Sequence, residues 1–187
     1  MPSITLIRHG PITLDLEQPV EARRFVELMD EADASGIRPD VPPPPELLAA
    51  VREAGCFLSS DLRRSQESAA LVAQGRPVQA DPLYREIPLR CHLPGSFRLP
   101  ALSFFRFLRL LRRWGLAFDG ESVGQTRRRA GEAAEALESL ATAHPSVVLV
   151  AHAMINRQIA GALRRRGWRG PERPSSKNWG ATVYRRG

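Results

Sequence analysis

The sequence predicts a three-layer α/β/α sandwich with a mostly parallel central sheet. Short, continuous apolar segments alternate along the chain with longer segments of helical periodicity. A continuous apolar run such as residues 147–150 is typical of a strand that is buried on both faces, as in parallel sheets. Alternation of such strands with helices indicates a sheet that is covered by helices. With 187 residues, the chain is expected to form one domain over residues 1–187.

The strands of this sheet are predicted from short apolar or β-branched segments. They are residues 4–8, 56–58, 77–80, 147–150 and 182–184. Residues 77–80 are predicted as a short edge strand. Residues 82–100 contain several prolines and no clear period, so we predict a long loop there, and long loops in compact domains are often functional.

The predicted helices carry apolar residues at helical spacing among charged ones. They span residues 20–34, 46–54, 62–74, 101–114, 122–143 and 154–166. Gly36 and Pro39 close the first helix. Pro45 stands near the first turn of the second helix, which ends at Gly55. A hydroxyl or carboxylate within residues 59–61 can cap the third helix.

The predicted helix at 101–114 has two different faces. Its arginines gather on one face, namely Arg106, Arg109, Arg112 and Arg113. Its apolar face contains Phe104, Phe107, Leu111 and Trp114. We expect this helix to cover a core, either as a cap over the active site or as the contact of a homodimer. A basic amphipathic helix on a membrane surface is the alternative.

The chain is basic, with 27 Lys and Arg against 20 Asp and Glu and a formal net charge of +7. Lys177 is the only lysine, which favours a general bias toward arginine over a nucleic-acid function. Aromatic residues are not interleaved with the arginines as a stacking platform would require. An arginine-rich nucleic-acid binder, with steeply salt-dependent DNA binding, is the alternative. The charge also attracts anionic substrates such as phosphates.

The chain shows no sign of export or membrane insertion. No apolar run approaches the roughly 18 residues that span a bilayer, and no basic segment followed by an apolar one precedes the first strand. We therefore expect a cytoplasmic protein without a transmembrane segment. Cys56 and Cys91 have no metal-ligand spacing, and we expect reduced thiols there, with a single disulfide as the alternative.

Polar side chains follow three of the predicted strands. Arg8 and His9 end the first strand, Ser59–Asp61 follow the second with Arg64 on the next helical turn, and His152 follows the strand at 147–150. Ligands of open α/β sheets bind beyond the carboxyl ends of the strands. Two histidines and two arginines on one such rim would form a cationic pocket for a phosphoryl group. Arginine binds phosphate oxygens through two donors, and a neutral imidazole can act as a nucleophile.

Several motifs resemble those of the histidine phosphatase superfamily, which has the phosphoglycerate mutase-like fold. Leu6-Ile7-Arg8-His9-Gly10 is similar to its hallmark motif, and Ser59–Ser65 is similar to its second motif, in which the leucine places the essential arginine on Arg64. Gly120-Glu121-Ser122 and Val148–His152 resemble two further segments of the family, the latter carrying its second histidine. Asn178 and Thr182-Val183 fit the closing strand. The resemblance covers nearly the whole chain, in the family's order.

The resemblance implies a two-step covalent reaction that needs no metal and no cofactor. His9 would become a phosphohistidine, while Arg8, Arg64 and His152 hold the phosphoryl oxygens. A carboxylic acid would protonate the leaving oxygen and then deprotonate water. Glu86, in a setting similar to that of the family's glutamate, is the main candidate for this acid. Glu67 and Glu121 are the alternatives.

The chain also departs from the family's pattern. Pro11-Ile12-Thr13 follows Gly10, where many members have a glutamate or serine and then threonine, so Thr13 is a candidate for a hydrogen bond to the substrate. Ala153 replaces the usual glycine after His152, a change that is tolerated if its φ is negative. The mutases' recognition segment after the first strand is replaced by a charged helix and a proline run, which favours a phosphatase over a mutase.

We therefore expect a phosphomonoesterase that acts on a phosphorylated small molecule, without specific nucleic-acid binding. Arg90, His92 and Arg98, in the predicted loop, are further candidates for contacts with the substrate. One alternative is a phosphohistidine-protein phosphatase. The other is a catalytically weak module that binds phosphate or phosphoproteins. A carboxylate within reach of the leaving group distinguishes an enzyme from such a module.

Overall fold

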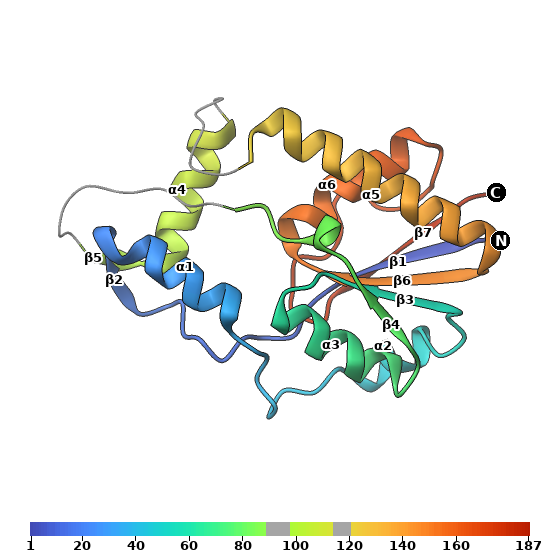
Figure 1. The fold of residues 1–187 in the computed structure, drawn as a ribbon, viewed down its shortest axis with the longest axis horizontal. Coiled ribbons are helices and arrows are strands. Elements are labelled where there is room, and N and C mark those ends of the chain that lie inside the picture. Colours follow the sequence, from blue (N-terminus) through green and yellow to red (C-terminus); the bar gives the residue numbers. More distant parts are fainter. Residues whose placement is uncertain (89–97, 114–120) are drawn as a thin grey trace.

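The computed structural model describes residues 1–88, 98–113 and 121–187 of the chain. Its centre is a five-stranded sheet with the strand order β4-β3-β6-β1-β7 (Figure 1). The strands are β1 (Ser3–Arg8), β3 (Cys56–Ser59), β4 (Val78–Ala80), β6 (Ser146–Ala151) and β7 (Ala181–Arg185). β7 runs antiparallel to β1, and the other pairs of this sheet are parallel. The predicted mostly parallel sheet is confirmed.

Helices cover both faces of the sheet (Figure 1). α5 (Val123–Ala143) and α6 (Ala153–Arg165) lie on one face. α2 (Pro45–Ala50) and α3 (Arg63–Ala73) lie on the other face. The predicted three-layer architecture is therefore confirmed, although α2 is shorter than the helix predicted at 46–54.

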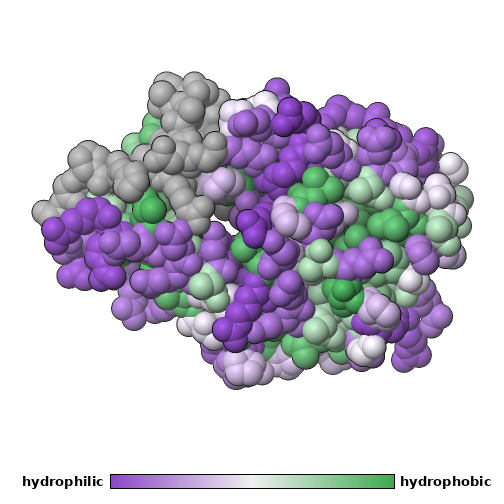
Figure 2. Space-filling model, viewed as in Figure 1, coloured by the Kyte–Doolittle hydropathy of each residue, from purple (hydrophilic) through white to green (hydrophobic). Residues whose placement is uncertain are grey.

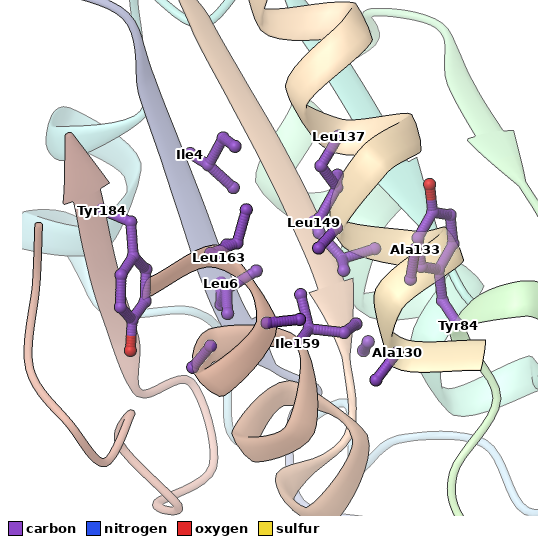
Figure 3. Close-up of a cluster of buried hydrophobic side chains, with 14 of the residues drawn as sticks. Ile4, Leu6, Tyr84, Ala130, Ala133, Leu137, Leu149, Ile159, Leu163 and Tyr184 are labelled. Atoms are coloured by element: carbon purple, nitrogen blue, oxygen red, sulfur yellow. The ribbon is translucent and has the colours of Figure 1, made fainter. Parts of the chain in front are cut away.

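Alternating residues of the central strands supply both apolar layers. Ile4, Leu6 and Leu149 pack in the cluster beneath α5 and α6 (Figure 3). Ile7 and Val148 pack in the cluster on the side of α2 and α3. Because successive side chains of a strand point to opposite faces, a strand that is buried on both sides needs apolar residues throughout. This requirement explains the continuous apolar runs of β1 and β6.

A smaller group of elements, which we call the lobe, lies beside the main body (left in Figure 1). It consists of β2 (Pro19–Glu21), α1 (Phe25–Ala34), β5 (Arg98–Pro100) and α4 (Ala101–Arg113). Its own apolar cluster contains Ala22, Phe25, Met29, Phe104 and Leu108. The ring of Phe25 lies 5.3 Å from that of Phe104, centroid to centroid. The lobe is thus held together by contacts between α1 and α4.

Two predictions about the lobe are wrong in detail. The helix predicted at 20–34 begins only at Phe25, because Pro19–Glu21 pair with Arg98–Pro100 as an antiparallel two-stranded sheet and a 3₁₀ turn follows at Ala22–Arg24. β5 therefore lies within the predicted loop at 82–100, and another 3₁₀ turn occupies Pro82–Tyr84. Strands of three residues have too few positions to show a period, and this pairing is a tertiary contact.

The predicted helix at 101–114 is confirmed as α4, but its predicted apolar face is only partly buried. Ala101, Phe104 and Leu108 form the buried stripe, at the spacing of one helical face. Phe107 lies at the margin of that stripe and is 50% exposed. Trp114 and the side chains of Arg109, Arg112 and Arg113 lie outside the described part of the chain.

Cys56 is a buried free thiol at the start of β3, and Cys91 lies outside the described residues. Of the helices in the described ranges, none has the length and apolar character needed to cross a bilayer.

Candidate active site

The sheet brings the three polar strand ends together. In the register of β1 and β6, Arg8 lies opposite Ala151, so His9 and His152 follow at the same edge. β3 lies on the other side of β6, where Ser59 pairs with Val150 and Ser60 follows. The rings of His9 and His152 lie 5.1 Å apart, centroid to centroid. The parallel register thus explains why residues far apart in the sequence share one site.

His9 is buried and held as a neutral imidazole. Its Nδ1 lies 2.7 Å from the carbonyl oxygen of Gly10. A carbonyl can only accept a hydrogen bond, so Nδ1 carries the proton and Nε2 keeps a lone pair. Burial, followed by the charges of Arg64 and Arg8, lowers the pKa of His9 from its usual 6.5 to about 3. The side chain is therefore a neutral nitrogen base throughout the physiological pH range.

His152 directly precedes α6 and is fully buried. Its Nε2 lies 2.9 Å from the hydroxyl oxygen of Ser60, which also accepts a hydrogen bond from the backbone N–H of Leu62. Burial lowers the pKa of His152 well below its usual value, and the positive charges of Arg64 and Arg8 act in the same direction. Ser60 thus orients the second histidine. The predicted side-chain cap within residues 59–61 is wrong, because the N-cap residue of α3 is Leu62 and no side chain caps the helix there.

Two arginines bring positive charge to the histidines. Arg8 donates through Nη1 to the carbonyl oxygen of Ser176, at 2.5 Å. Arg64 is only 6% exposed and donates through Nη1 to the carbonyl oxygen of Ala32, at 2.6 Å, and through Nη2 to Asp33, at 3.1 Å. Both charges act on His9 and His152 by lowering their pKa values. The structure thus gathers Arg8, Arg64 and the two histidines at one corner.

The carboxylate of Glu86 lies at the beginning of α6. It accepts hydrogen bonds from the backbone N–H groups of Met154, Ile155 and Ile87, at 3.0–3.2 Å. The first N–H groups of a helix have no partner within the helix, so a carboxylate is stabilised there. Because α6 begins directly after His152, this contact holds Glu86 beside the histidine corner.

The two alternative carboxylates have other surroundings. Glu67 accepts from the N–H of Ile37 and from Arg63, and it is not among the described residues that line the cleft. Glu121 lines the cleft but forms a two-bond ion pair with Arg129, at 2.6 and 2.9 Å. Arg129 also donates to the carbonyl oxygens of Leu83 and Arg85, directly before Glu86. This pair therefore holds the segment that carries Glu86.

A cleft of about 1310 Å³ opens from the histidine corner, between the lobe and the main body, where the surface is hollowed (Figure 2). Arg8, His9, Arg64 and Glu86 line it on the side of the body. On the side of the lobe it is lined by Met29, Asp33, Leu102, Phe105 and Arg106. Of the two predicted roles of helix 101–114, a cap over the site and a homodimer contact, the first agrees with these lining residues of α4.

The remaining candidates for substrate contacts are placed differently. Thr13 is exposed and lines the cleft. Arg98 is not among its described lining residues and donates instead to the carbonyl oxygen of Pro19. Arg90 and His92 lie outside the described residues. Ala153 is the first residue of α6 and does not have a positive φ, so the alanine causes no backbone strain there.

Some supporting contacts of the site could not be recognised in the sequence. Ser68 accepts from the N–H of Gly10 and donates to the carbonyl oxygen of Arg64, which ties α3 to the end of β1. Asn178 donates to the carbonyl oxygen of His9. Trp179 lies so close to Gly10 that a Cβ there would be 2.3 Å from its ring, which explains the glycine after His9. Ser68 lies one helical turn after Arg64, and this spacing is the sequence signal for its contact with the main chain of Arg64.

The buried histidines make stability depend on pH. Folding lowers the pKa of His9 from about 6.5 to about 3, so in acid the unfolded chain binds a proton that the folded chain does not. The free energy of unfolding is therefore highest above pH 6.5, and it falls as the pH is lowered toward 3. At pH 5 we expect His9 alone to cost about 2 kcal/mol of unfolding free energy relative to pH 7.5. Urea unfolding at both pH values should show a smaller loss for His9→Gln than for the wild type. Equal losses would contradict this account.

Comparisons with known proteins show the family and the fold of this chain. The family model described as the histidine phosphatase superfamily (branch 1) matches residues 4–186. A search of curated protein sequences finds no match. Similar folds are found among solved structures, with sequence identities of 16–23% for the three named below.

The similar structures include two phosphatases and a hydrolase. A phosphoserine phosphatase mutant from Entamoeba histolytica, in complex with phosphoserine, has a TM-score of 0.66 and 16% identity, covering 98% of this chain and 90% of that one. A mycobacterial glucosyl-3-phosphoglycerate phosphatase has a TM-score of 0.60 and 19% identity, covering 88% and 80%. A mycobacterial hydrolase has a TM-score of 0.59 and 23% identity, covering 88% and 72%. At these identities the similarity shows the fold.

Proposed function

Because this chain belongs to the histidine phosphatase superfamily, branch 1, we propose that it hydrolyses a phosphomonoester through a phosphohistidine formed on His9. The observation that carries this proposal is the hydrogen bond from Nδ1 of His9 to the carbonyl oxygen of Gly10. It keeps the proton on Nδ1 and leaves Nε2 as the nucleophile. The lowered pKa of His9 keeps that nitrogen unprotonated at neutral pH.

In the first step, the lone pair of His9 Nε2 attacks the phosphorus atom and the bond to the leaving oxygen breaks. Glu86 in its protonated form gives that oxygen its proton, so that the alcohol departs neutral. In the second step, the Glu86 carboxylate takes a proton from water, the water oxygen attacks phosphorus, and the P–N bond breaks. His9 is then neutral again and Glu86 is protonated.

Positive charge and hydrogen-bond donors stabilise the phosphoryl group during both steps. We assign this role to Arg8, Arg64 and His152, which surround His9 at the ends of β1, β3 and β6. Preorganised donors in a buried site stabilise the developing charge on phosphoryl oxygens. The mechanism needs no metal ion, because the two guanidinium groups supply the charge.

The placement of Glu86 favours an enzyme over a binding module. A module that only binds phosphate needs the cationic corner but no carboxylate beside it, because a carboxylate repels the ligand. Glu86 lines the cleft and is held at the first turn of α6. We propose a phosphorylated small molecule as substrate, which is the class named for the two similar phosphatases.

We expect the purified protein to hydrolyse an aryl phosphate, and millimolar EDTA to leave the rate unchanged. The assay should be repeated with small phosphomonoesters and with a phosphohistidine-containing protein. Loss of activity in EDTA that is restored by a divalent metal would contradict the metal-independent mechanism. Hydrolysis of the phosphohistidine protein alone would replace the proposed substrate class by phosphoproteins.

A further inference from the structure

We propose that Asp33, on the last turn of α1, positions Arg64 for phosphate and thereby makes the affinity of the site depend on the lobe. The inference rests on the proposed function, because it assigns phosphate binding to Arg64. Asp33 has no part in the mechanism described above. It belongs to the charged helix that follows the first strand, where the chain departs from the mutases.

The contacts of Arg64 join the two parts of the molecule. Arg64 stands at the beginning of α3 in the main body, and its side chain is 7% exposed. Both terminal nitrogens of its guanidinium donate to the end of α1, to the carbonyl oxygen of Ala32 and to the carboxylate of Asp33. Among the described residues, Asp33 is the carboxylate that pairs with this buried charge. A buried cation needs such a partner.

These two hydrogen bonds determine the orientation of the guanidinium group. The group is planar and rigid, so anchoring Nη1 and Nη2 to two fixed acceptors sets its plane. It has five N–H donors, of which α1 takes two. Among the described residues none accepts from the remaining donors, including Nε–H, which leaves these donors for phosphoryl oxygens. The main chain of Arg64 is also held, because Ser68 bridges its carbonyl oxygen to the N–H of Gly10.

Asp33 has two opposing effects on phosphate binding. Its negative charge repels a phosphate dianion, but the carboxylate is 40% exposed and solvent screens that repulsion. Its charge-assisted hydrogen bond holds a guanidinium group that solvent barely reaches, and hydrogen bonds to charged groups are the stronger kind. The positioning effect therefore outweighs the repulsion, and loss of Asp33 weakens phosphate binding.

The first test compares the affinity for inorganic phosphate, measured by calorimetry, among variants of the full chain. We expect Asp33→Ala to raise the Kd for phosphate about tenfold. Asp33→Asn keeps an oxygen acceptor and should raise it only about threefold. Glu31→Gln removes an exposed charge from the same helix and should match the wild type. Thermal unfolding of each variant establishes that the variants are folded, and Asp33→Asn decides the test if Asp33→Ala does not fold.

A second test asks whether Asp33 acts through Arg64. In the Arg64→Ala background, adding Asp33→Ala should lower kcat/KM for an aryl phosphate no further. If Asp33→Ala lowered kcat/KM equally with and without Arg64, the inference would be overturned. Unchanged or tighter phosphate binding by both Asp33→Ala and Asp33→Asn would also overturn it. Neither outcome would affect the proposed function. An unchanged phosphate Kd with a raised KM would instead assign Asp33 to the leaving group. A wild type that neither binds phosphate nor hydrolyses the ester would overturn the proposed function as well.

Discussion

Replacing His9 with alanine is expected to abolish phosphatase activity, lowering kcat by about 10⁴-fold or more. The covalent route ends because the nucleophile is removed, while Arg8, Arg64 and His152 still bind phosphate. The measurement is the turnover of an aryl phosphate, together with the Kd for inorganic phosphate. His144→Ala, which changes a histidine at the C-terminal end of α5, is the matched control and should retain full activity.

The same variant tests the intermediate directly. Wild-type protein quenched during turnover should carry an acid-labile phosphate that is stable in base, as expected for a phosphoramidate bond. The His9→Ala protein should carry none. Substantial turnover by His9→Ala would refute the assignment of the nucleophile, and labelling of that variant would place the phosphoryl group on another residue.

Replacing Glu86 with glutamine is expected to lower kcat by about 10²- to 10⁴-fold, with little change in phosphate affinity. Glutamine has the same shape, and its amide oxygen at the Oε1 position can still accept from the N–H groups of Ile155 and Ile87. It cannot, however, give a proton to the leaving oxygen or take one from water. Rates for aryl and alkyl phosphates, together with the Kd for phosphate, provide the measurement.

The choice of leaving group adds a second criterion. An alkyl oxide is a much stronger base than an aryl oxide, so its departure depends more on proton transfer from an acid. The decrease in kcat caused by Glu86→Gln should therefore be larger for an alkyl phosphate than for an aryl phosphate. Glu67→Gln is the control, because Glu67 was an alternative in the sequence but does not line the described cleft. If Glu86→Gln turned over both substrates normally, Glu121, which lines the cleft, would be the next carboxylate to test.

The main layers of the fold could be predicted because their signals are local. The continuous apolar runs of β1 and β6 identify strands that are buried on both faces, and α5 and α6 were predicted to within one residue at each end. The lobe could not be predicted to the same degree. β2 and β5 are three residues long, and they exist because they pair with each other across 76 intervening residues.

The sequence predicted which residues gather at the candidate site, but not the hydrogen bonds that hold them in place. Arg8, His9, Arg64 and His152 each stand at a recognisable strand end or in a motif. The contacts of Glu86 with the first turn of α6 required the packing of distant segments. Ser60 could be recognised as part of the second motif, but its bond to His152 depends on β3 lying beside β6.

By itself, the sequence of this protein determined the layered fold, the family and the residue types gathered at the carboxyl ends of the strands, beginning with Arg8-His9-Gly10. These follow from periodicity and motif spacing, which are properties of neighbouring residues. Only the tertiary structure decided which nitrogen of His9 carries the proton, which carboxylate lies beside the histidines and which acidic residue holds Arg64. Each of these depends on burial and on hydrogen bonds between atoms that only the fold brings together. The sequence alone does not reveal such contacts.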